Sequence, residues 1–586
     1  MSNPGAGDAI EIFKNRLRRL ILRAFATRAE LLAEVPISAA ELLLATKGAT
    51  VPPWRKVAEP VIVACLRREH PGISEAELDD AVAQWLRLWR AAKEVEDSGV
   101  VIAAEPVAET AAPPRPHGKR LLAIGAAVAV LVGAAVAVRA ALPDESDCAA
   151  AGLTEESGQC VGVADGVFPG LDPSVAEIVD RIAEQNRAVE GDAVEIALLG
   201  PLGRLAEAGS PGQLDPNQVR QMLIGAAVAQ QRVNTSALVR DPRPAVRLVL
   251  ANTGGYQDHW QTPVRELIER ADRPDPRLVA TVLLGTSLDH TRAAAAELAR
   301  AEMPMIGAIT SAEEFNSRDL PGLIRVSPTS GDYVSTLAGY LRANRPESRA
   351  IVVWDQNSDR RGDLFAGSLR KAFAEQLAPW IGNRPQQSFV GAGIPTEKVW
   401  PQMFATPTIN TCQSGADVVL FAGRVIDLPA FIEALAARAC RERPLLVMTG
   451  AAALTTVDRT QQQQLRDGGL TLVYGGVTDP HTWPVGAAAR PPGYDPFLHA
   501  LTAEGFSAGD SDAYTCLAHD AVFTATLAVR MASEGRIPPR GNVAVAFDNI
   551  NSGHRVPGCS GELTFTTAGN GSPIGSGIEA VTIPYP

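Results

Sequence analysis

Short apolar and β-branched runs alternate with helical stretches from about Val194 onward. Each run ends in Gly or a polar residue, and most are followed by a segment with helical spacing, which is typical of an α/β protein. The seven runs exceed one ordinary sheet half, so we expect two doubly wound, Rossmann-like lobes that hold a ligand between them at the carboxyl ends of their strands. The runs span 194–200, 245–251, 278–285, 350–355, 417–423, 444–450 and 470–476.

Residues 8–95 follow a helical period instead. Apolar side chains recur on one face of the first segment, and Ser or Thr followed three residues later by Glu marks three helix starts. The pairs are Thr27 with Glu30, Ser38 with Glu41, and Ser74 with Glu77. This pattern predicts a small all-α domain over residues 1–100. Trp85 and Trp89, one turn apart, favour core packing over a ligand platform.

The stretch TRAELLAEVPISAAELLLATKGATVPPW resembles the phage-repressor-like helix-turn-helix family. The resemblance implies that the helix over 38–46 is presented to base edges, yet that helix is mostly apolar, with only Glu41, Thr46 and Lys47 polar. A helical bundle that docks another cytoplasmic protein is the alternative interpretation.

One uncharged apolar segment, Leu121 to Val138, is about the minimum length that crosses a bilayer. Basic residues cluster before it and acidic residues follow Arg139, so the positive-inside bias predicts a cytoplasmic N-terminus. We therefore expect a linker over 101–118, a transmembrane helix over 119–142, a Cys-containing linker and helix over 143–190, and the two-lobed domain over 191–586.

Charge and cysteine content agree with this division. Basic and acidic residues balance over residues 1–100, so the whole formal charge of −12 falls on the remainder, which disfavours nucleic-acid binding by the large domain. Cys65 precedes the apolar segment and six cysteines follow it, an even set that predicts disulfides in an oxidising compartment. Of the possible pairings we expect the sequence neighbours: Cys148 with Cys160, Cys412 with Cys440, and Cys516 with Cys559. Six reduced core thiols are the alternative.

The order of segments over residues 190–586 resembles the type I periplasmic binding proteins, most closely the branched-chain amino-acid-binding receptors of ABC transporters. The likeness is carried by IALLGPLG, LLGTSLDHTRAAAAELARAEMPMIGAITS, LIRVSPTSGDYVSTLAGYL, AIVVWDQNSDRRGDLFAGSLRKAF, SDAYTCLAHDAVFTATLAV and GELTFTTAGNG. It implies that loops at strand ends grip the ligand. The implied positions are Gly200, Pro201, Leu202, Thr286, Ser287, Ala308, Thr310 and Arg361.

Hydroxyls and free loop amides at such positions can accept a ligand carboxylate, although Ser287 and Thr310 are equally well explained as helix caps. Arg361 stands where the family has an aromatic residue, and Ala451 and Ala452 follow the strand where a carboxylate would pair with a ligand ammonium. An α-amino acid is therefore disfavoured, and Arg361 and Arg424 indicate either an anionic ligand or plain salt bridges.

Three functions fit this organisation. The first is a membrane sensor, expected to be a homodimer, that closes on a small molecule and signals to the inner domain. The second is a tethered receptor that delivers solute to a permease, and the third is a membrane-bound transcription regulator. We expect no enzyme, cofactor or metal, because the chain lacks the common catalytic and nucleotide-binding motifs. Neighbouring residues on a helix face different directions, so His519 beside Asp520 is interpreted as structural.

Overall fold

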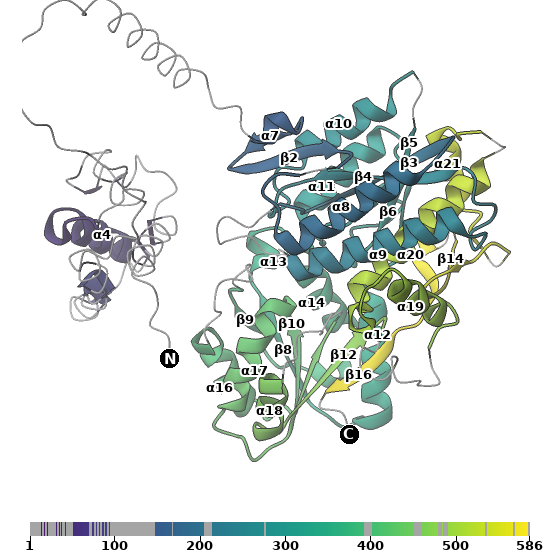
Figure 1. Ribbon diagram of the computed structural model, residues 1–586. Coiled ribbons are helices and arrows are strands. Elements are labelled where there is room, and N and C mark those ends of the chain that lie inside the picture. The colour runs from purple at the N-terminus through teal and green to yellow at the C-terminus, as the bar shows by residue number, and fades with distance from the viewer. Residues whose placement is uncertain are drawn as a thin grey trace, which may run out of the picture. The chain divides into compact units, whose positions relative to one another are not determined.

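The structure is a computed structural model (Figure 1), and it divides the chain into two compact units, Met1–Val132 and Gly133–Pro586. It describes residues 51–69, single positions between Phe13 and Lys93, and residues 147–583 apart from gaps. The gaps are 167, 204–213, 275–276, 392–400, 451–458, 479–482, 484–489, 534–535, 552 and 567–568. The predicted linker over 101–118 and the apolar segment 121–138 lie outside the described residues. Within the described ranges, no helix combines the length and apolarity that a membrane crossing requires.

The described part of the N-terminal unit has a helical core. A π-helical turn, η1 (Trp54–Ala58), leads directly into α4 (Glu59–Glu69). Phe13 packs edge-on against Trp85, and Trp89 Nε1 donates to the Pro52 carbonyl oxygen at 2.7 Å, so both tryptophans belong to the core as expected. Of the expected base-reading helix 38–46 only Leu42 is described, and its side chain is buried in that core.

A seven-stranded sheet forms the first lobe of the larger unit. Strands β3 to β7 are parallel and run in the order β4-β3-β5-β6-β7, with β2 antiparallel against β4 and β1 on β2. Their bounds are β1 (Thr154–Glu156), β2 (Gln159–Ala164), β3 (Ala193–Gly200), β4 (Ala245–Asn252), β5 (Leu278–Leu283), β6 (Met305–Gly307) and β7 (Leu323–Arg325).

Helices cover both faces of this sheet (Figure 1). One face buries α8 (Pro173–Ala188), α9 (Pro216–Thr235), α20 (Ala513–Ala532) and α21 (Arg540–Phe547) in the largest core cluster. The other face packs α10 (Gln261–Ala271) and α11 (Asp289–Arg300). The strands are apolar on both faces because both faces are buried, which is why they read as continuous apolar runs in the sequence.

The second lobe repeats the design. Its sheet has the order β16-β12-β11-β10-β8-β9, parallel except for β16 on β12. The strands are β8 (Ala350–Asp355), β9 (Gln387–Phe389), β10 (Val418–Ala422), β11 (Leu445–Thr449), β12 (Leu470–Gly476) and β16 (Glu579–Ile583). One face packs α12 (Ser330–Asn344), α14 (Leu364–Gln376) and α15 (Ala378–Ile381); the other packs α16 (Ala405–Gln413), α17 (Leu428–Ala436) and the Leu465 side chain of α18 (Arg459–Asp467). The short helix α13 (Asn357–Arg360) follows β8.

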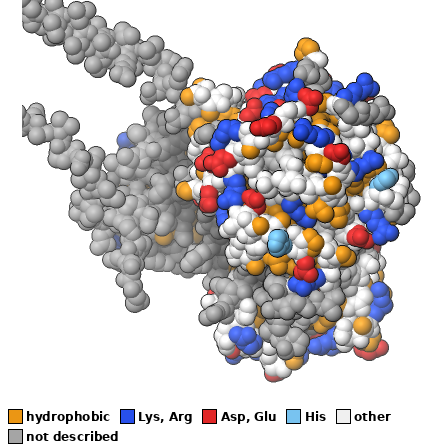
Figure 2. Space-filling view, turned by 45° about the vertical axis from the view of Figure 1, so that its right-hand side comes forward, with side chains coloured by type: hydrophobic (Ala, Val, Ile, Leu, Met, Phe, Trp, Pro, Cys, Tyr) orange, Lys and Arg blue, Asp and Glu red, His pale blue; other side chains and the backbone are white. Residues whose placement is uncertain are grey.

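The described elements place three chain crossings between the lobes. They follow β7, follow β12 on the way to α19 (Tyr494–Ala503), and follow a small sheet on the way to β16. That small sheet contains β13 (Val556–Pro557), β14 (Gly561–Phe565) and β15 (Pro573–Ser576). Several parallel crossings between two separately packed cores are typical of a hinge that lets lobes close as rigid bodies. On the surface, basic and acidic side chains are intermingled over the face that Figure 2 shows.

The expected α/β architecture is confirmed: all seven predicted strands are present, with ends within two residues of the predicted ones. The expected disulfides are confirmed as well, and their Cα–Cα separations are 5.1, 5.7 and 5.3 Å for 148/160, 412/440 and 516/559. The first disulfide joins the short helix α7 (Asp147–Ala150) to β2. Cys65 is buried and takes no part in a disulfide.

Candidate functional site

A partly open cavity of about 90 Å³ lies where the two lobes meet. Its lining comes from loops at the carboxyl ends of β5, β6, β7, β10 and β12 and from the first turns of α12, α14 and α20. Both sheets follow the same doubly wound order, in which the third strand of the chain lies beside the first. In such sheets the loops after the first and third strands leave in opposite directions, which opens a crevice between these two strands. The third strand is β5, beside β3, in the first lobe and β10, beside β8, in the second.

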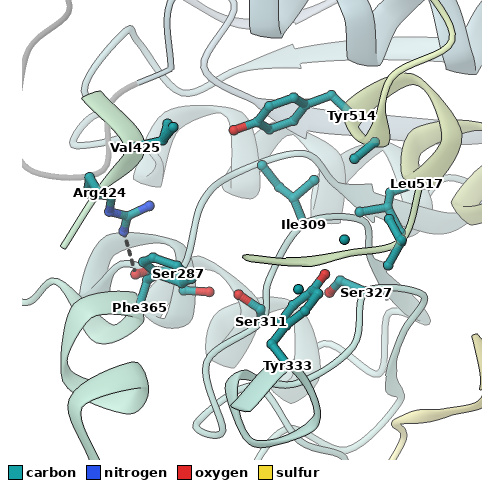
Figure 3. A pocket seen from close by; sticks show the side chains of 14 residues that line it. Ser287, Ile309, Ser311, Ser327, Tyr333, Phe365, Arg424, Val425, Tyr514 and Leu517 are labelled. Carbon is teal, nitrogen blue, oxygen red and sulfur yellow. Dashed lines mark hydrogen bonds between the residues drawn. The ribbon is translucent and has the colours of Figure 1, made fainter. Parts of the chain in front are cut away.

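Arg424 bridges the lobes at this crevice, where its guanidinium reaches Ser287 (Figure 3). The same guanidinium forms a bidentate ion pair with Asp363, with Nε at 2.9 Å from one carboxylate oxygen and Nη2 at 2.7 Å from the other. Nη2 also donates to the backbone carbonyl oxygen of Ser287 in the first lobe at 3.2 Å. Asp363 is fully buried and accepts from the Ala366 amide, so it caps α14 while it neutralises Arg424.

Backbone hydrogen bonds strengthen this junction. The Phe365 amide donates to the Ser287 carbonyl oxygen at 3.2 Å, and the Asp289 amide donates to the Gly362 carbonyl oxygen at 3.0 Å. Leu288 and Asp363 form an isolated antiparallel bridge between the same two segments. The lobes are therefore in direct main-chain contact on one side of the cavity, which is the arrangement of a closed cleft.

Hydroxyl groups supply the hydrogen-bonding capacity of the cavity (Figure 3). Ser287 Oγ accepts from the Ala312 amide, Ser327 Oγ donates to the Thr310 carbonyl oxygen, and the Tyr514 hydroxyl accepts from Gln218 Nε2. Each of these oxygens keeps a further donor or acceptor position. The hydroxyls of Ser311 and Tyr333 have no hydrogen-bond partner among the described residues.

Tyr333 owes its position to a close approach of two backbones. A Cβ added at Gly475 of β12 would lie 2.8 Å from Tyr333 Cδ1, so the ring of α12 fits over the strand only because that position is glycine. Burial raises the pKa of Tyr333 and of Tyr514 well above the ordinary tyrosine value. Both hydroxyls consequently remain protonated at neutral pH.

The chemistry of the described lining is neutral. Apart from the hydroxyls it consists of apolar side chains, backbone and the paired Arg424, without histidine, cysteine or carboxylate. Among the described residues no three His, Cys, Asp or Glu side chains gather as metal ligands. The arrangement can therefore enclose and hydrogen-bond a small molecule, and it places no nucleophile beside a general base.

Two of the predicted binding residues, Ser287 and Arg424, line the cavity, and the others do not. Thr286 turns away, since its hydroxyl and amide are both bound by Gln257. Ala308 and Thr310 are fully buried, whereas their neighbours Ile309 and Ser311 face the cavity. Successive side chains of an extended segment point in opposite directions, so the prediction chose the right loop and the wrong face.

The remaining predicted positions also lie elsewhere. Gly200 packs against Leu284, where an added Cβ would come within 2.8 Å of the Leu284 Cβ, and the amide of the buried Leu202 donates a hydrogen bond to Asn252 Oδ1. Pro201 between them is buried too. Arg361 is exposed at the end of α13 and does not line the cavity. Neither Ser287 nor Thr310 caps a helix; α11 begins after Leu288 without a side-chain cap, and α12 is capped by Thr329.

Sequence reasoning missed the aromatic residues of the site. Phe365, whose ring centroid lies 5.1 Å from the Arg424 guanidinium carbon, lines the cavity together with Tyr333 and Tyr514. Each stands in the first turn of a helix whose Asp or Thr cap is visible in the sequence: Asp363, Thr329 and Asp512. An aromatic residue in the first turn of a helix, just after its N-terminal cap, was therefore the sequence feature that could have identified these lining residues. Of the two interpretations of Arg424, an anionic ligand or a salt bridge, the structure shows a salt bridge with Asp363.

His519 and Asp520 have a structural role, as expected. The expectation that their side chains face different directions was wrong. Their side chains touch, with Nδ1 at 2.8 Å from Asp520 Oδ1, and Arg232 lies 2.7 Å from Nε2. Asp520 also accepts from the Cys559 and Ser560 amides. All of this is fully buried in the first lobe and outside the cavity lining.

Solved structures similar to this chain are solute-binding proteins. An ABC transporter substrate-binding protein from Desulfitobacterium hafniense in complex with Leu is 15% identical, with 66% of this chain and 96% of that chain covered and a TM-score of 0.48. A leucine-binding protein from Thermotoga maritima is 16% identical, with 66% and 97% covered and a TM-score of 0.46. A solute-binding protein of an ABC transporter from Rhodopseudomonas palustris in complex with p-hydroxybenzoic acid is 14% identical, with 66% and 91% covered and a TM-score of 0.48.

No protein-family model matches the chain, and no curated protein matches it. What the three solute-binding proteins hold is a property of those proteins. The ligand of this chain has to be inferred from the residues of its own cavity.

Proposed function

We propose that this chain is a membrane-anchored receptor whose two lobes close around a small molecule outside the cytoplasm and signal that closure to the helical domain of residues 1–100. The observation that carries the proposal is the cavity between the lobes, closed on one side by the contact of Arg424 with Ser287. Three chain crossings between separately packed cores support a hinge motion. A receptor that only captured solute would not need a folded inner domain.

The membrane anchor of this proposal is the apolar segment 121–138. Its support is the basic cluster ahead of it and the distribution of cysteines, since Cys65 forms no disulfide and the six later cysteines pair with one another. Disulfides persist outside the cytoplasm and are rare inside it. The N-terminal helical domain is thus proposed to be cytoplasmic and the lobes extracytoplasmic.

The binding test is a thermal-shift screen of the full chain in detergent with amino acids, small carboxylates, nucleosides, sugars and small neutral amides and phenols. A ligand at about one hundred times its dissociation constant adds about 2.7 kcal/mol to the free energy of unfolding, which is a clear shift. Ser311→Phe, which fills the cavity, is expected to abolish the shift, and Thr502→Phe on the exposed face of α19 is expected to keep it. A shift that survives Ser311→Phe, or no shift with any class, contradicts the proposal.

The topology test is protease added to intact cells. Cleavage beyond Pro143 with full protection of residues 1–100 is expected, because only the lobes are proposed to face outward. Protection of the lobes in intact cells, with cleavage after lysis, contradicts the anchored arrangement.

A further inference from the structure

We infer that the ligand of the cavity between the lobes is a compact, uncharged molecule with an apolar body and one hydrogen-bonding edge. The inference rests on the proposed receptor function and names its ligand class. It differs from the amino acid of the resembled family, which the sequence already disfavoured, and from the small anion that the sequence left open. It follows from three properties of the cavity: its charge, its hydrogen-bonding groups and its size.

Charge is the first property. The one ionisable cation among the described lining residues, Arg424, is already held by both oxygens of Asp363, a carboxylate with no exposed surface. The pair has no net charge, and two of the guanidinium nitrogens, Nε and Nη2, are occupied by Asp363 and by the Ser287 carbonyl oxygen. A ligand carboxylate or ammonium that enters the space between the lobes would lose much of its water without gaining a counter-charge. Such burial costs several kcal/mol per ion.

The hydrogen-bonding groups are the second property. Ser311 and Tyr333 are buried residues whose hydroxyls make no hydrogen bond to another described residue, and both oxygens face the cavity beside Ser327 (Figure 3). A ligand group that bonds such a hydroxyl gains about 0.5–1.5 kcal/mol. Hydroxyls both donate and accept, which suits an amide, alcohol or phenol edge on the ligand.

The apolar body follows from the rest of the lining. Ile309, Leu517, Val425 and Val477 surround the space, and Phe365 and Tyr514 present rings to it. These side chains come from both lobes, so closure removes most of the apolar part of a ligand from water. The volume of about 90 Å³ favours a compact ligand.

Matched pairs of probes that differ only in charge test the inference. Isobutyramide is compared with isobutyrate, and benzamide with benzoate, with valine as a zwitterion of similar shape. Binding to the full chain in detergent at pH 7 is measured by saturation-transfer NMR. The neutral member of a pair is expected to bind about tenfold more tightly than its anion, and valine is expected to bind no better than isobutyrate.

Variants of the cavity test whether its residues cause the preference for the neutral probe. Ser311→Ala and Tyr333→Phe are expected to weaken amide binding about fivefold, because each removes a cavity hydroxyl, and Tyr333→Phe keeps the ring that packs on Gly475. Thr310→Val, one residue away on the opposite face, is the matched control and is expected to leave binding unchanged. Asp363→Asn keeps the shape of the α14 cap but releases the charge of Arg424, so it is expected to reverse the preference in favour of benzoate.

Each result separates the two proposals. If isobutyrate, benzoate or valine binds best and Ser311→Ala weakens that binding, the receptor function stands and the neutral ligand class is overturned. If no probe binds and the wider thermal-shift screen is also negative, both are overturned. An unchanged preference in Asp363→Asn overturns the role given to charge neutralisation.

Discussion

Arg424 Nη2 donates a hydrogen bond of 3.2 Å to the backbone carbonyl oxygen of Ser287, although the two residues belong to different lobes. The residues occupy equivalent places, because Ser287 follows β5 and Arg424 follows β10, the third parallel strand of each sheet. The contact therefore exists only while the strand ends of the two lobes face each other closely. It is a direct indicator of the closed state, and the Asp363 carboxylate holds it in place.

Removing the partner of Arg424 is expected to destabilise the larger unit strongly. Asp363→Ala leaves a nearly buried guanidinium unpaired and removes the cap of α14, so a loss of about 3 kcal/mol is expected. The control is Asp359→Ala, which breaks the more exposed pair with Arg370 and is expected to cost less than about 1 kcal/mol. Urea unfolding followed by fluorescence measures both; equal losses would show that the interlobe pair contributes no more than a surface pair.

Thr310→Val is expected to stabilise the fold by about 1 kcal/mol. The Thr310 side chain has no exposed surface and its hydroxyl has no partner in the described part of the chain, so the valine methyl removes a buried unsatisfied group without a change of shape. The measurement is the urea midpoint of the variant against the parent chain. A loss of stability would mean that the hydroxyl is bound in solution, for instance by an ordered water.

The buried imidazole of His519 predicts a loss of stability in mild acid. Burial lowers its pKa to about 4, and the neutral ring is satisfied on both sides, since Nδ1–H donates to Asp520 and Nε2 accepts from Arg232. The unfolded chain has a histidine pKa of about 6.5, so it binds the proton first. The stabilisation is therefore complete above about pH 6.5 and is lost as the pH falls toward 4.

The variant His519→Gln isolates this term, because glutamine cannot titrate. The free energy of unfolding of the parent chain is expected to fall, relative to that of the variant, by an amount on the order of 3 kcal/mol between pH 7 and pH 4. Denaturation in urea at a series of pH values gives the difference. Parallel pH profiles would show that His519 does not resist protonation.

The three disulfides predict a simple thiol count. The chain has seven cysteines, of which six form disulfides and Cys65 does not. Maleimide labelling of the chain in denaturant without reductant is expected to modify a single thiol, Cys65, and labelling after reduction is expected to modify all seven. Mass spectrometry distinguishes the two states. Labelling of Cys412 or Cys559 without reductant would contradict an oxidising location for the lobes.

The fold was predictable where the strands are long and buried on both faces. β3, β4 and β12 each present seven or eight residues with little polar interruption, and such runs need no structure to be recognised. β6, β7 and β9 were missed because three residues carry no measurable period. They form because neighbouring strands supply the hydrogen-bonding edge, which is tertiary information.

The site was predictable only to the level of its loops. The sequence predicted that Ala308 and Thr310 bind the ligand, whereas Ile309 and Ser311 line the cavity. Which side chains of a loop face a cavity depends on what packs behind the loop, and the sequence does not show this. Arg424 and Asp363 are 61 residues apart in the sequence, so no local pattern predicts that they pair. The salt bridge with Asp363 therefore became visible only in the structure.

The disulfide between Cys148 and Cys160 has a mechanical consequence. The chain reaches the first lobe through α7, and without the cross-link a pull on that end would first peel α7 and β1 away from the sheet. With the covalent bond in place, tension passes from Cys148 straight into β2, which is hydrogen-bonded along β4. The segment that precedes the first lobe is thereby cross-linked to its sheet, and a force applied at that end acts on the lobe as one rigid unit.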